Sequence, residues 1–308
     1  MKHGLLLINT GSPANPTPKA VREYLKKFLM DPHVIDLPWI LRAALVYGII
    51  LPRRPKKTAV AYQKIWTSNG SPLVHHSTTL AQKLEQEINR PVAVGMSYGT
   101  PTIASAIDTL LSQNCTQIHL LPLFPHSAQA TTGSAIQHTK QILKNKAKLH
   151  LIPPFYKHPA YIKLLAQSIK TRSEHLLISY HGLPLRHLKK MKSPTYLEQC
   201  TATTNALIKA ANLDPRFVHT AFQSRMGRTA WIQPYTTDLL QQLPKQGVKN
   251  LSILAPSFFC DGLETLEELH LQAKEIFLQA GGKTFHPIPC PNSSPAAVAC
   301  LKEIASLD

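Results

Sequence analysis

The chain has 308 residues, which is enough for two domains or one large α/β domain, and its 44% hydrophobic content is sufficient to build a buried core. Its 34 lysines and arginines outnumber 17 acidic residues, giving a net charge of +17. Such an excess points to nucleic acid, an anionic membrane or an anionic small substrate. The sequence has no helix-turn-helix, zinc-finger or RNA-binding aromatic signature and its lysines are spread along the chain, so we expect no nucleic-acid partner.

The cysteines and the N-terminal residues indicate the cellular compartment of the protein. The five cysteines are odd in number, widely spaced and without a C-x-x-C pair, which argues against a disulfide framework and against structural zinc. The first residues run directly into an apolar strand and lack the long apolar region and cleavage site of a signal peptide. We therefore expect a cytoplasmic protein.

Eight short apolar runs alternate with helix-like segments along the chain. They are residues 5–8, 92–96, 118–123, 149–152, 176–179, 217–222, 251–255 and 285–288. Continuous apolar runs separated by helices are typical of parallel strands buried on both faces. Residues 5–13 also align without gaps on residues 176–184, pairing both glycines and both prolines.

This internal match predicts two similar Rossmann-like α/β domains, each a four-stranded parallel sheet flanked by helices, with an active-site cleft between them. The expected boundaries are 1–152 for the first domain and 153–289 for the second. The C-terminal helix, within 290–308, is expected to pack back on the first domain.

The segment 39–51 is apolar on every helical face and includes Arg42. It is shorter than the ~20 residues needed to span a bilayer. One interpretation is a buried helix. The other starts from the basic cluster at 53–57 that follows, because an apolar lip beside basic residues is typical of a segment that rests on an anionic membrane surface.

Two candidate groups for chemistry fall at strand ends of the second half. His181 follows the strand 176–179, and its counterpart in the first half is Thr10, which does not titrate. Glu264 and Glu268 lie four residues apart on the helix that follows the strand 251–255, so they share a helix face. Parallel strands end at one edge of their sheet, so an imidazole and carboxylates there predict a general base with its partner, or ligands for a metal such as Fe²⁺. The alternative is structural, with Asp261 as the helix N-cap and Glu264 favoured by the helix dipole.

The stretch 222–235 supplies polar donors, Arg225, Arg228 and Trp231 at another strand end, a set suited to a flat acidic ligand. An ordinary loop with Trp231 packed in the core is the alternative. No Gly-x-Gly-x-x-Gly follows the first strand and no Walker lysine is present, so we expect no nucleotide cofactor.

Several motifs in order along almost the whole chain resemble those of the ferrochelatase family, lyases that insert ferrous iron into a porphyrin. They are Gly-Ser-Pro at 11–13, Tyr62 through Ile65-Trp66-Thr67 to Gly70-Ser71-Pro72-Leu73, Thr-Thr-Gly-Ser at 131–134, the His181 motif, Gln223-Ser224-Arg225 with Trp231, and Leu263-Glu264-Thr265-Leu266.

The resemblance implies a set of site residues. His181 and Glu264 are expected to face each other across the porphyrin pocket as catalytic groups and metal ligands, with Glu268 as a possible relay. Arg54, Tyr62 and Ser71 are expected to line the porphyrin site, with Lys57 nearby. Thr10, Tyr98 and Trp231 complete the expected substrate-binding set.

The resemblance also implies the reaction, which is Fe²⁺ insertion into protoporphyrin IX to give protohaem in the last step of haem biosynthesis, with release of two protons. Fe²⁺ is then a substrate. Only Cys290 and Cys300 lie near the C-terminus, where family members with a 2Fe–2S cluster place several cysteines, so we expect no cluster. The apolar lip implies peripheral association with the inner membrane. The alternatives are a chelatase for coproporphyrin III, another tetrapyrrole or another metal, and a non-catalytic haem or porphyrin carrier.

Overall fold

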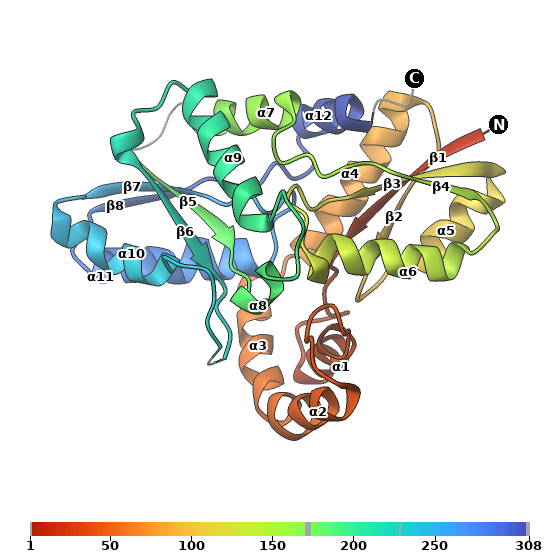
Figure 1. Cartoon of the computed structure of the whole chain (residues 1–308), viewed down its shortest axis with the longest axis horizontal. Coiled ribbons are helices and arrows are strands. Elements are labelled where there is room, and N and C mark those ends of the chain that lie inside the picture. Colours follow the sequence, from red (N-terminus) through yellow and green to blue (C-terminus); the bar gives the residue numbers. More distant parts are fainter. Residues whose placement is uncertain (1, 170–173, 228, 306–308) are drawn as a thin grey trace. The chain divides into compact units, whose positions relative to one another are not determined.

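The computed structural model describes residues 2–169, 174–227 and 229–305, so Arg228 lies outside the described residues. The chain divides into two compact units. The N-terminal unit runs to Pro154 and takes in the residues from Ser293 onward, and the C-terminal unit is Phe155–Asn292. In Figure 1 the N-terminal unit runs from red to yellow-green, with the last helix in dark blue, and the C-terminal unit runs from green to blue.

The N-terminal unit is built on a parallel sheet of strand order β2-β1-β3-β4. Its strands and helices are β1 (Lys2–Asn9), α1 (Pro18–Leu29), α2 (Trp39–Ala43), the π-helix η1 (Ala44–Ile50), α3 (Leu51–Ile65), α4 (Pro72–Ile88), β2 (Val92–Met96), α5 (Ile103–Ser112), β3 (Cys115–Pro122), the π-helix η2 (Gln129–Gly133), α6 (Ser134–Leu143), β4 (Lys148–Leu151) and α12 (Pro295–Ala305).

The C-terminal unit repeats this plan with a parallel sheet of order β6-β5-β7-β8. Its elements are α7 (Pro159–Ile169), β5 (His175–His181), α8 (Leu185–Leu188), α9 (Tyr196–Ala210), the 3₁₀ turn η3 (Pro215–Phe217), β6 (Val218–Gln223), α10 (Thr236–Gln242), the 3₁₀ turn η4 (Leu243–Gln246), β7 (Asn250–Leu254), the π-helix η5 (Leu263–Gln272), α11 (Ala273–Gln279) and β8 (Thr284–Pro287).

The predicted fold class, two four-stranded parallel sheets flanked by helices, is confirmed. In both sheets the first strand of the unit is central, so β1 and β5 are each paired on both sides. Leu5 to Ile8 of β1 are fully buried, as expected where helices cover both faces of a sheet. One face of each sheet packs on a cluster of apolar side chains from helices, α5 and α6 in the N-terminal unit and α10, η5 and α11 in the C-terminal unit.

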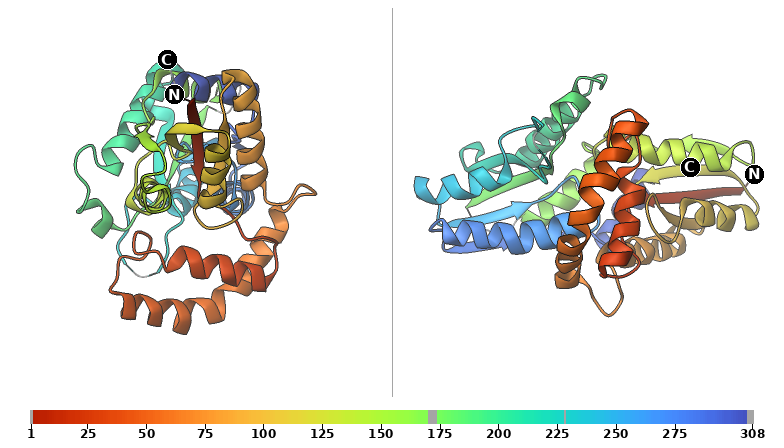
Figure 2. Two further views of the ribbon diagram at one scale, coloured as in Figure 1. Left: turned by 90° about the vertical axis from the view of Figure 1, so that its right-hand side faces the viewer. Right: turned by 90° about the horizontal axis from the view of Figure 1, so that it is seen from below.

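The interpretation of segment 39–51 as a buried helix is wrong. Several of its apolar side chains are exposed, with Trp39 66% and Ile40 72% exposed. Arg42 is buried together with Val46 and Leu51, and its guanidinium donates to the carbonyls of Ile35 and Leu37. The segment forms α2 and η1, which stand with α1 and α3 off one end of the N-terminal sheet (Figures 1 and 2). Among the described residues no helix is long and apolar enough to cross a membrane.

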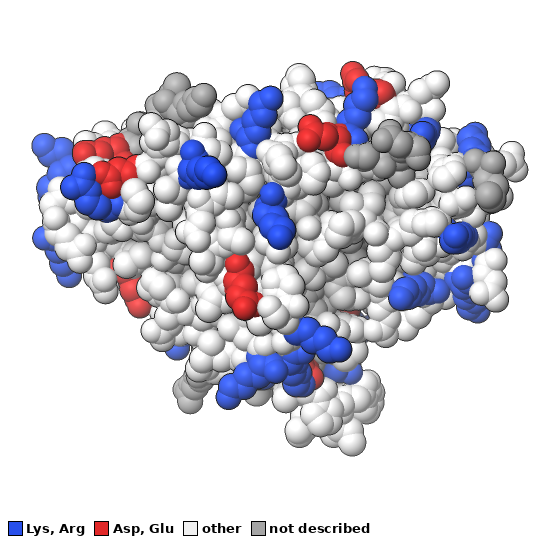
Figure 3. Space-filling model, turned by 45° about the horizontal axis from the view of Figure 1, so that its top comes forward, with Lys and Arg blue, Asp and Glu red and all other residues white. Residues whose placement is uncertain are grey.

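The excess of basic residues is not gathered in one place on the face drawn in Figure 3. Lysine and arginine side chains are distributed over that face, with fewer acidic side chains between them. A distributed excess favours general attraction of anions over a single dedicated anion site there.

Candidate active site

His181 is the last residue of β5, the strand at the centre of the C-terminal sheet. It lies opposite Gln223 at the end of β6, and the next amide, that of Gly182, donates to the Gln223 carbonyl at 2.8 Å. A Cβ at Gly182 would lie 2.8 Å from the same carbonyl oxygen, so only glycine permits this approach. The carboxyl edge of the sheet therefore presents the His181 side chain just where the chain leaves the strand.

The ring of His181 has a defined tautomer. Its Nδ1 lies 2.7 Å from the Gly182 carbonyl oxygen. A carbonyl only accepts hydrogen bonds, so Nδ1 carries the proton and, in the neutral ring, Nε2 keeps its lone pair. The ring meets Phe258 edge-on with centroids 6.0 Å apart. The available lone pair can accept a proton or ligate a metal.

Glu264 and Glu268 come from η5, and Gln223 connects that helix to the end of β5. The Gln223 amide nitrogen donates to the Glu264 carbonyl at 2.7 Å and to a Glu268 carboxylate oxygen at 3.4 Å. Its side-chain oxygen accepts from Ser179 on β5. Since Gln223 also lies opposite His181, the structure brings His181, Glu264 and Glu268 together at one edge of the sheet.

Glu268 is the most strongly held of these groups. Its carboxylate accepts from the Ser224 amide at 2.7 Å and also from the Ser224 hydroxyl. Burial raises the pKa of Glu268, and the charge of Glu264 adds to this, while the Ser224 donors and His181 oppose it. The Glu264 carboxylate, by contrast, is half-buried and has no hydrogen-bond partner among the described residues.

The prediction that Asp261 caps the helix carrying Glu264 is wrong. The Asp261 carboxylate accepts instead from the Asn292 amide at 2.7 Å and from the backbone of Cys290. The first orphan amide of η5 is satisfied by Thr265, whose hydroxyl accepts from Gly262 N–H at 3.0 Å. Thr265 does the capping because Asp261 is engaged by the chain that follows β8. Glu264 lies in the first turn of η5, and in the part of the chain that the structure describes its side chain makes no hydrogen bond that caps this helix.

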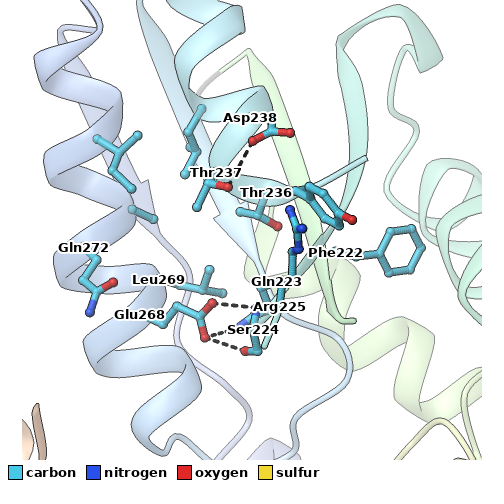
Figure 4. Close-up of a pocket in the computed structure, with 14 residues that line it drawn as sticks. Phe222, Gln223, Ser224, Arg225, Thr236, Thr237, Asp238, Glu268, Leu269 and Gln272 are labelled. Atoms are coloured by element: carbon cyan, nitrogen blue, oxygen red, sulfur yellow. Dashed lines mark hydrogen bonds between the residues drawn. The ribbon is translucent and has the colours of Figure 1, made fainter. Parts of the chain in front are cut away.

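A cavity of about 260 Å³ adjoins Glu268 on the side of α10. Glu268 and Ser224 lie at one side of it, Gln272 contributes from the end of η5, and Thr237 contributes from α10 (Figure 4). Arg225 lies over the ring of Tyr235, with its guanidinium carbon 4.6 Å from the ring centroid. The cavity gives Glu268 an approach for water, protons or small cations within the C-terminal unit.

Trp231 is 7% exposed. Its indole N–H donates to the Met226 carbonyl at 3.0 Å, and its ring faces the position that a Cβ on Gly182 would take. Trp231 thus links Met226 to the turn after β5. Arg225 extends from the same loop, and Arg228 lies outside the described residues.

The other predicted substrate residues all lie in the N-terminal unit. Arg54 and Lys57 are exposed on α3, and Thr10 is half-buried at the end of β1. Tyr62 and Ser71 are buried. These residues lie at the end of β1 and on the helices that follow it.

Tyr98 is a buried member of a polar cluster. Its hydroxyl donates to Asp31 at 2.6 Å and also contacts Ser134, and burial together with Asp31 raises its pKa. Asp31 accepts in addition from the His33 amide, at the turn that leads into α2. The side chain of Tyr98 therefore fixes this turn.

The donor set suits a metal ion in transit. Among residues 2–169, 174–227 and 229–305, no group of three or more His, Cys, Asp or Glu side chains is arranged to hold a metal. An imidazole nitrogen and a carboxylate suit a borderline ion such as Fe²⁺, and the small number of ligands leaves positions for other donors.

Ser224 holds Glu268, a contact that the sequence analysis did not predict although Ser224 belongs to the motif Gln223-Ser224-Arg225. Its backbone has a φ of 62°, and this left-handed conformation turns both its amide and its hydroxyl toward Glu268. A serine between Gln223 and Arg225 gives no signal of that geometry. The one available hint is the small polar residue directly after a buried strand.

Comparison with known proteins gives consistent matches over the full chain. The family model described as ferrochelatase matches residues 2–307. The chain is 42% identical over 330 residues to a ferrochelatase of Legionella pneumophila subsp. pneumophila (strain Philadelphia 1), covering 99% of both chains. It is also 42% identical to a ferrochelatase of Pectobacterium atrosepticum, covering 98% of this chain and 97% of that one. Among solved structures, SirB from Bacillus subtilis with Fe³⁺ superposes with a TM-score of 0.59 at 13% identity, covering 99% of this chain and 96% of that chain, a likeness of fold.

Proposed function

Since the chain belongs to the ferrochelatase family, we propose that His181 and Glu264 bind the Fe²⁺ that it inserts into porphyrin in haem synthesis. The observation that carries this proposal is the tautomer of His181, whose Nε2 lone pair is left available because Nδ1 donates to Gly182. The unpartnered carboxylate of Glu264 supplies an oxygen ligand on the helix beside it.

The reaction requires that two pyrrole protons leave the macrocycle as Fe²⁺ enters. The same Nε2 lone pair can hold the metal or accept a proton, so the two roles of His181 are exclusive at any moment. Glu268 supports proton exit, since burial raises its pKa and a cavity adjoins its carboxylate. Glu264 then serves as the metal ligand and Glu268 as the relay.

We expect His181→Ala to abolish iron insertion while porphyrin binding persists, and Glu264→Gln to lower kcat by about 100-fold, within the range of general acid–base and ligand losses. Anaerobic absorption spectroscopy follows insertion, and porphyrin fluorescence quenching follows binding. Glu275→Gln, which alters an exposed carboxylate on α11, is the matched control and should turn over normally. Near-normal insertion by folded His181→Ala contradicts the assignment, and a Glu264→Gln effect confined to thermal stability restricts Glu264 to a structural role.

Arg54 and Lys57 are proposed to attract the propionates of the porphyrin, because exposed basic side chains on one helix are suited to carboxylate recognition. Thr10, Tyr62, Ser71 and Trp231 are proposed to contact the macrocycle. Tyr98 is proposed to act through the turn it holds with Asp31. Running the assay with protoporphyrin IX and with coproporphyrin III identifies the porphyrin, and repeating it with Co²⁺ and Ni²⁺ identifies the metal preference.

We further propose that the exposed apolar side chains of α2 and η1, Trp39, Ile40, Leu41, Tyr47 and Ile49, rest on an anionic membrane surface. Lys26 supports this, because its ammonium lies 6.0 Å from the Tyr47 ring centroid, and Arg53, Arg54, Lys56 and Lys57 are exposed on the next helix. The protein is then cytoplasmic and peripherally associated with the inner membrane.

Vesicle co-sedimentation tests this placement. The protein should bind vesicles with 30% phosphatidylglycerol and bind neutral vesicles less well, and the double variant Trp39→Ser, Ile40→Ser should lose most of the binding at unchanged thermal stability. Leu278→Ser, which changes an exposed leucine of α11, is the matched control. Equal binding by the lip variant and the control would contradict the proposal.

A further inference from the structure

The backbone on both sides of His181 is held by a closed circuit of hydrogen bonds. The His181 amide lies 3.2 Å from the Ser257 hydroxyl, which lies 3.0 Å from the Tyr196 hydroxyl, which lies 2.8 Å from the His181 carbonyl. The direction of each bond follows from the chemistry of the groups. The carbonyl only accepts, so Tyr196 donates to it, and Ser257 therefore donates to Tyr196 while accepting from the His181 amide.

The circuit lies beyond the last residue of β5 that pairs with β7. Pairing of β5 with β7 ends at Ile178 and Leu254, whereas pairing with β6 continues to His181 and Gln223. On the side of β7, the backbone of His181 therefore has no strand beside it. Ser257, from the segment after β7, and Tyr196, the first residue of α9, supply the missing partners.

The two bonds to His181 constrain both of its backbone dihedrals. The bond to its amide fixes the preceding peptide plane and the bond to its carbonyl fixes the following one. The constraint matters because the next residue is Gly182, which is permissive in φ and ψ and carries the carbonyl that accepts from Nδ1. Tyr196 is 3% exposed, and burial raises its pKa well above its usual value, so its hydroxyl stays a neutral donor.

We infer that Tyr196 and Ser257 are positioning residues that hold the backbone of His181 so that Nδ1 donates to Gly182 and Nε2 faces the metal. The inference rests on the role proposed for His181. Without the circuit, the peptide after His181 is held only by the bond from Gly182 N–H to the Gln223 carbonyl. The bond from Nδ1 is then lost in part of the population, and the proton redistributes between the ring nitrogens. Partners that orient a metal-ligating histidine are worth about 10- to 100-fold in activity or affinity.

The test separates this role from a contribution to folding. Tyr196→Phe and Ser257→Ala each break the circuit and keep the remaining side chain, whereas Ser257→Thr keeps the hydroxyl. Tyr161→Phe is the matched control, because Tyr161 is fully buried in the same unit and its hydroxyl donates to the Pro256 carbonyl at 2.7 Å, outside the circuit.

The main readout is the tautomer of His181, measured by long-range ¹H–¹⁵N correlation on protein with labelled histidine. Comparison with His181→Ala assigns its signal among the 15 histidines. We expect the wild type, Ser257→Thr and Tyr161→Phe to show the proton on Nδ1, and Tyr196→Phe and Ser257→Ala to show a mixture. In the latter two, kcat should fall about tenfold with KM for porphyrin unchanged.

The inference is overturned if Tyr196→Phe and Ser257→Ala keep the wild-type tautomer, or if they merely lower Tm as Tyr161→Phe does. This outcome is distinct from failure of the proposed role of His181, which would appear as iron insertion by His181→Ala. The tautomer measurement needs no turnover and decides the role of the circuit in either case.

Discussion

Glu268 shows how one neighbouring residue sets the protonation of a buried carboxylate. Ser224 provides two donors to it from a single position, which the left-handed backbone at Ser224 makes possible. Burial raises the pKa of Glu268, and these donors hold it back because they favour the charged form. The Ser224 hydroxyl therefore lowers the pH at which Glu268 releases its proton.

Removing that hydroxyl should raise the pKa of Glu268 further. We expect Ser224→Ala and Ser224→Gly to shift the acidic limb of the kcat profile to higher pH and to leave the rate at alkaline pH close to that of the wild type. Glycine suits a φ of 62° better than alanine, so the two variants should differ in Tm and agree in pH profile. Thr237→Ala removes a hydroxyl from the same cavity without touching Glu268 and is the control. An unshifted limb in both Ser224 variants would show that Glu268 does not govern the rate.

At the scale of elements, the sheets were predictable and the connections were not. The strands read directly as apolar runs because both faces of each sheet are covered, and the match of residues 5–13 to 176–184 reflects two central strands in equivalent positions. Thr10 and His181 follow as equivalent strand ends. The grouping of His181 with Glu264 was also predictable, since parallel strands end at one edge.

The predictions that were wrong concern segments whose polar groups form hydrogen bonds with residues outside the segment. Most side chains of segment 39–51 are apolar, yet Arg42 is buried while Trp39 and Ile40 are exposed. Arg42 is buried because its guanidinium donates to the carbonyls of Ile35 and Leu37. Asp261 precedes a helix as an N-cap residue would, but its carboxylate accepts a hydrogen bond from the side chain of Asn292, 31 residues later. Ser257 and Tyr196 contact His181 in the folded chain, and their spacing in the sequence does not predict these contacts.

At the scale of the whole molecule, the stability of the fold should depend on histidines inside its sheets. In the N-terminal unit His119 on β3 stacks between His3 and His150, with centroids 5.3 and 4.8 Å away. In the C-terminal unit His175 and His219 stack in the same way across β5 and β6. Burial, with the charges of His150, His3 and Arg90, lowers the pKa of His119 to about 4, and burial also lowers the pKa of His219.

A lowered pKa in a folded histidine means that the unfolded chain binds the proton first. The unfolded side chain titrates at about 6.5, so the contribution of His119 to stability is fully present above that pH and is lost as the pH falls toward about 4. We therefore expect Tm to fall between pH 7.5 and pH 5.0 and to fall less in His119→Phe, which keeps a stacked ring but does not titrate. His286→Phe, at an exposed position on β8, is the control and should follow the wild type. Differential scanning calorimetry at matched ionic strength measures both. If His119→Phe loses as many degrees as the wild type over this range, the histidine stack is not a source of acid sensitivity.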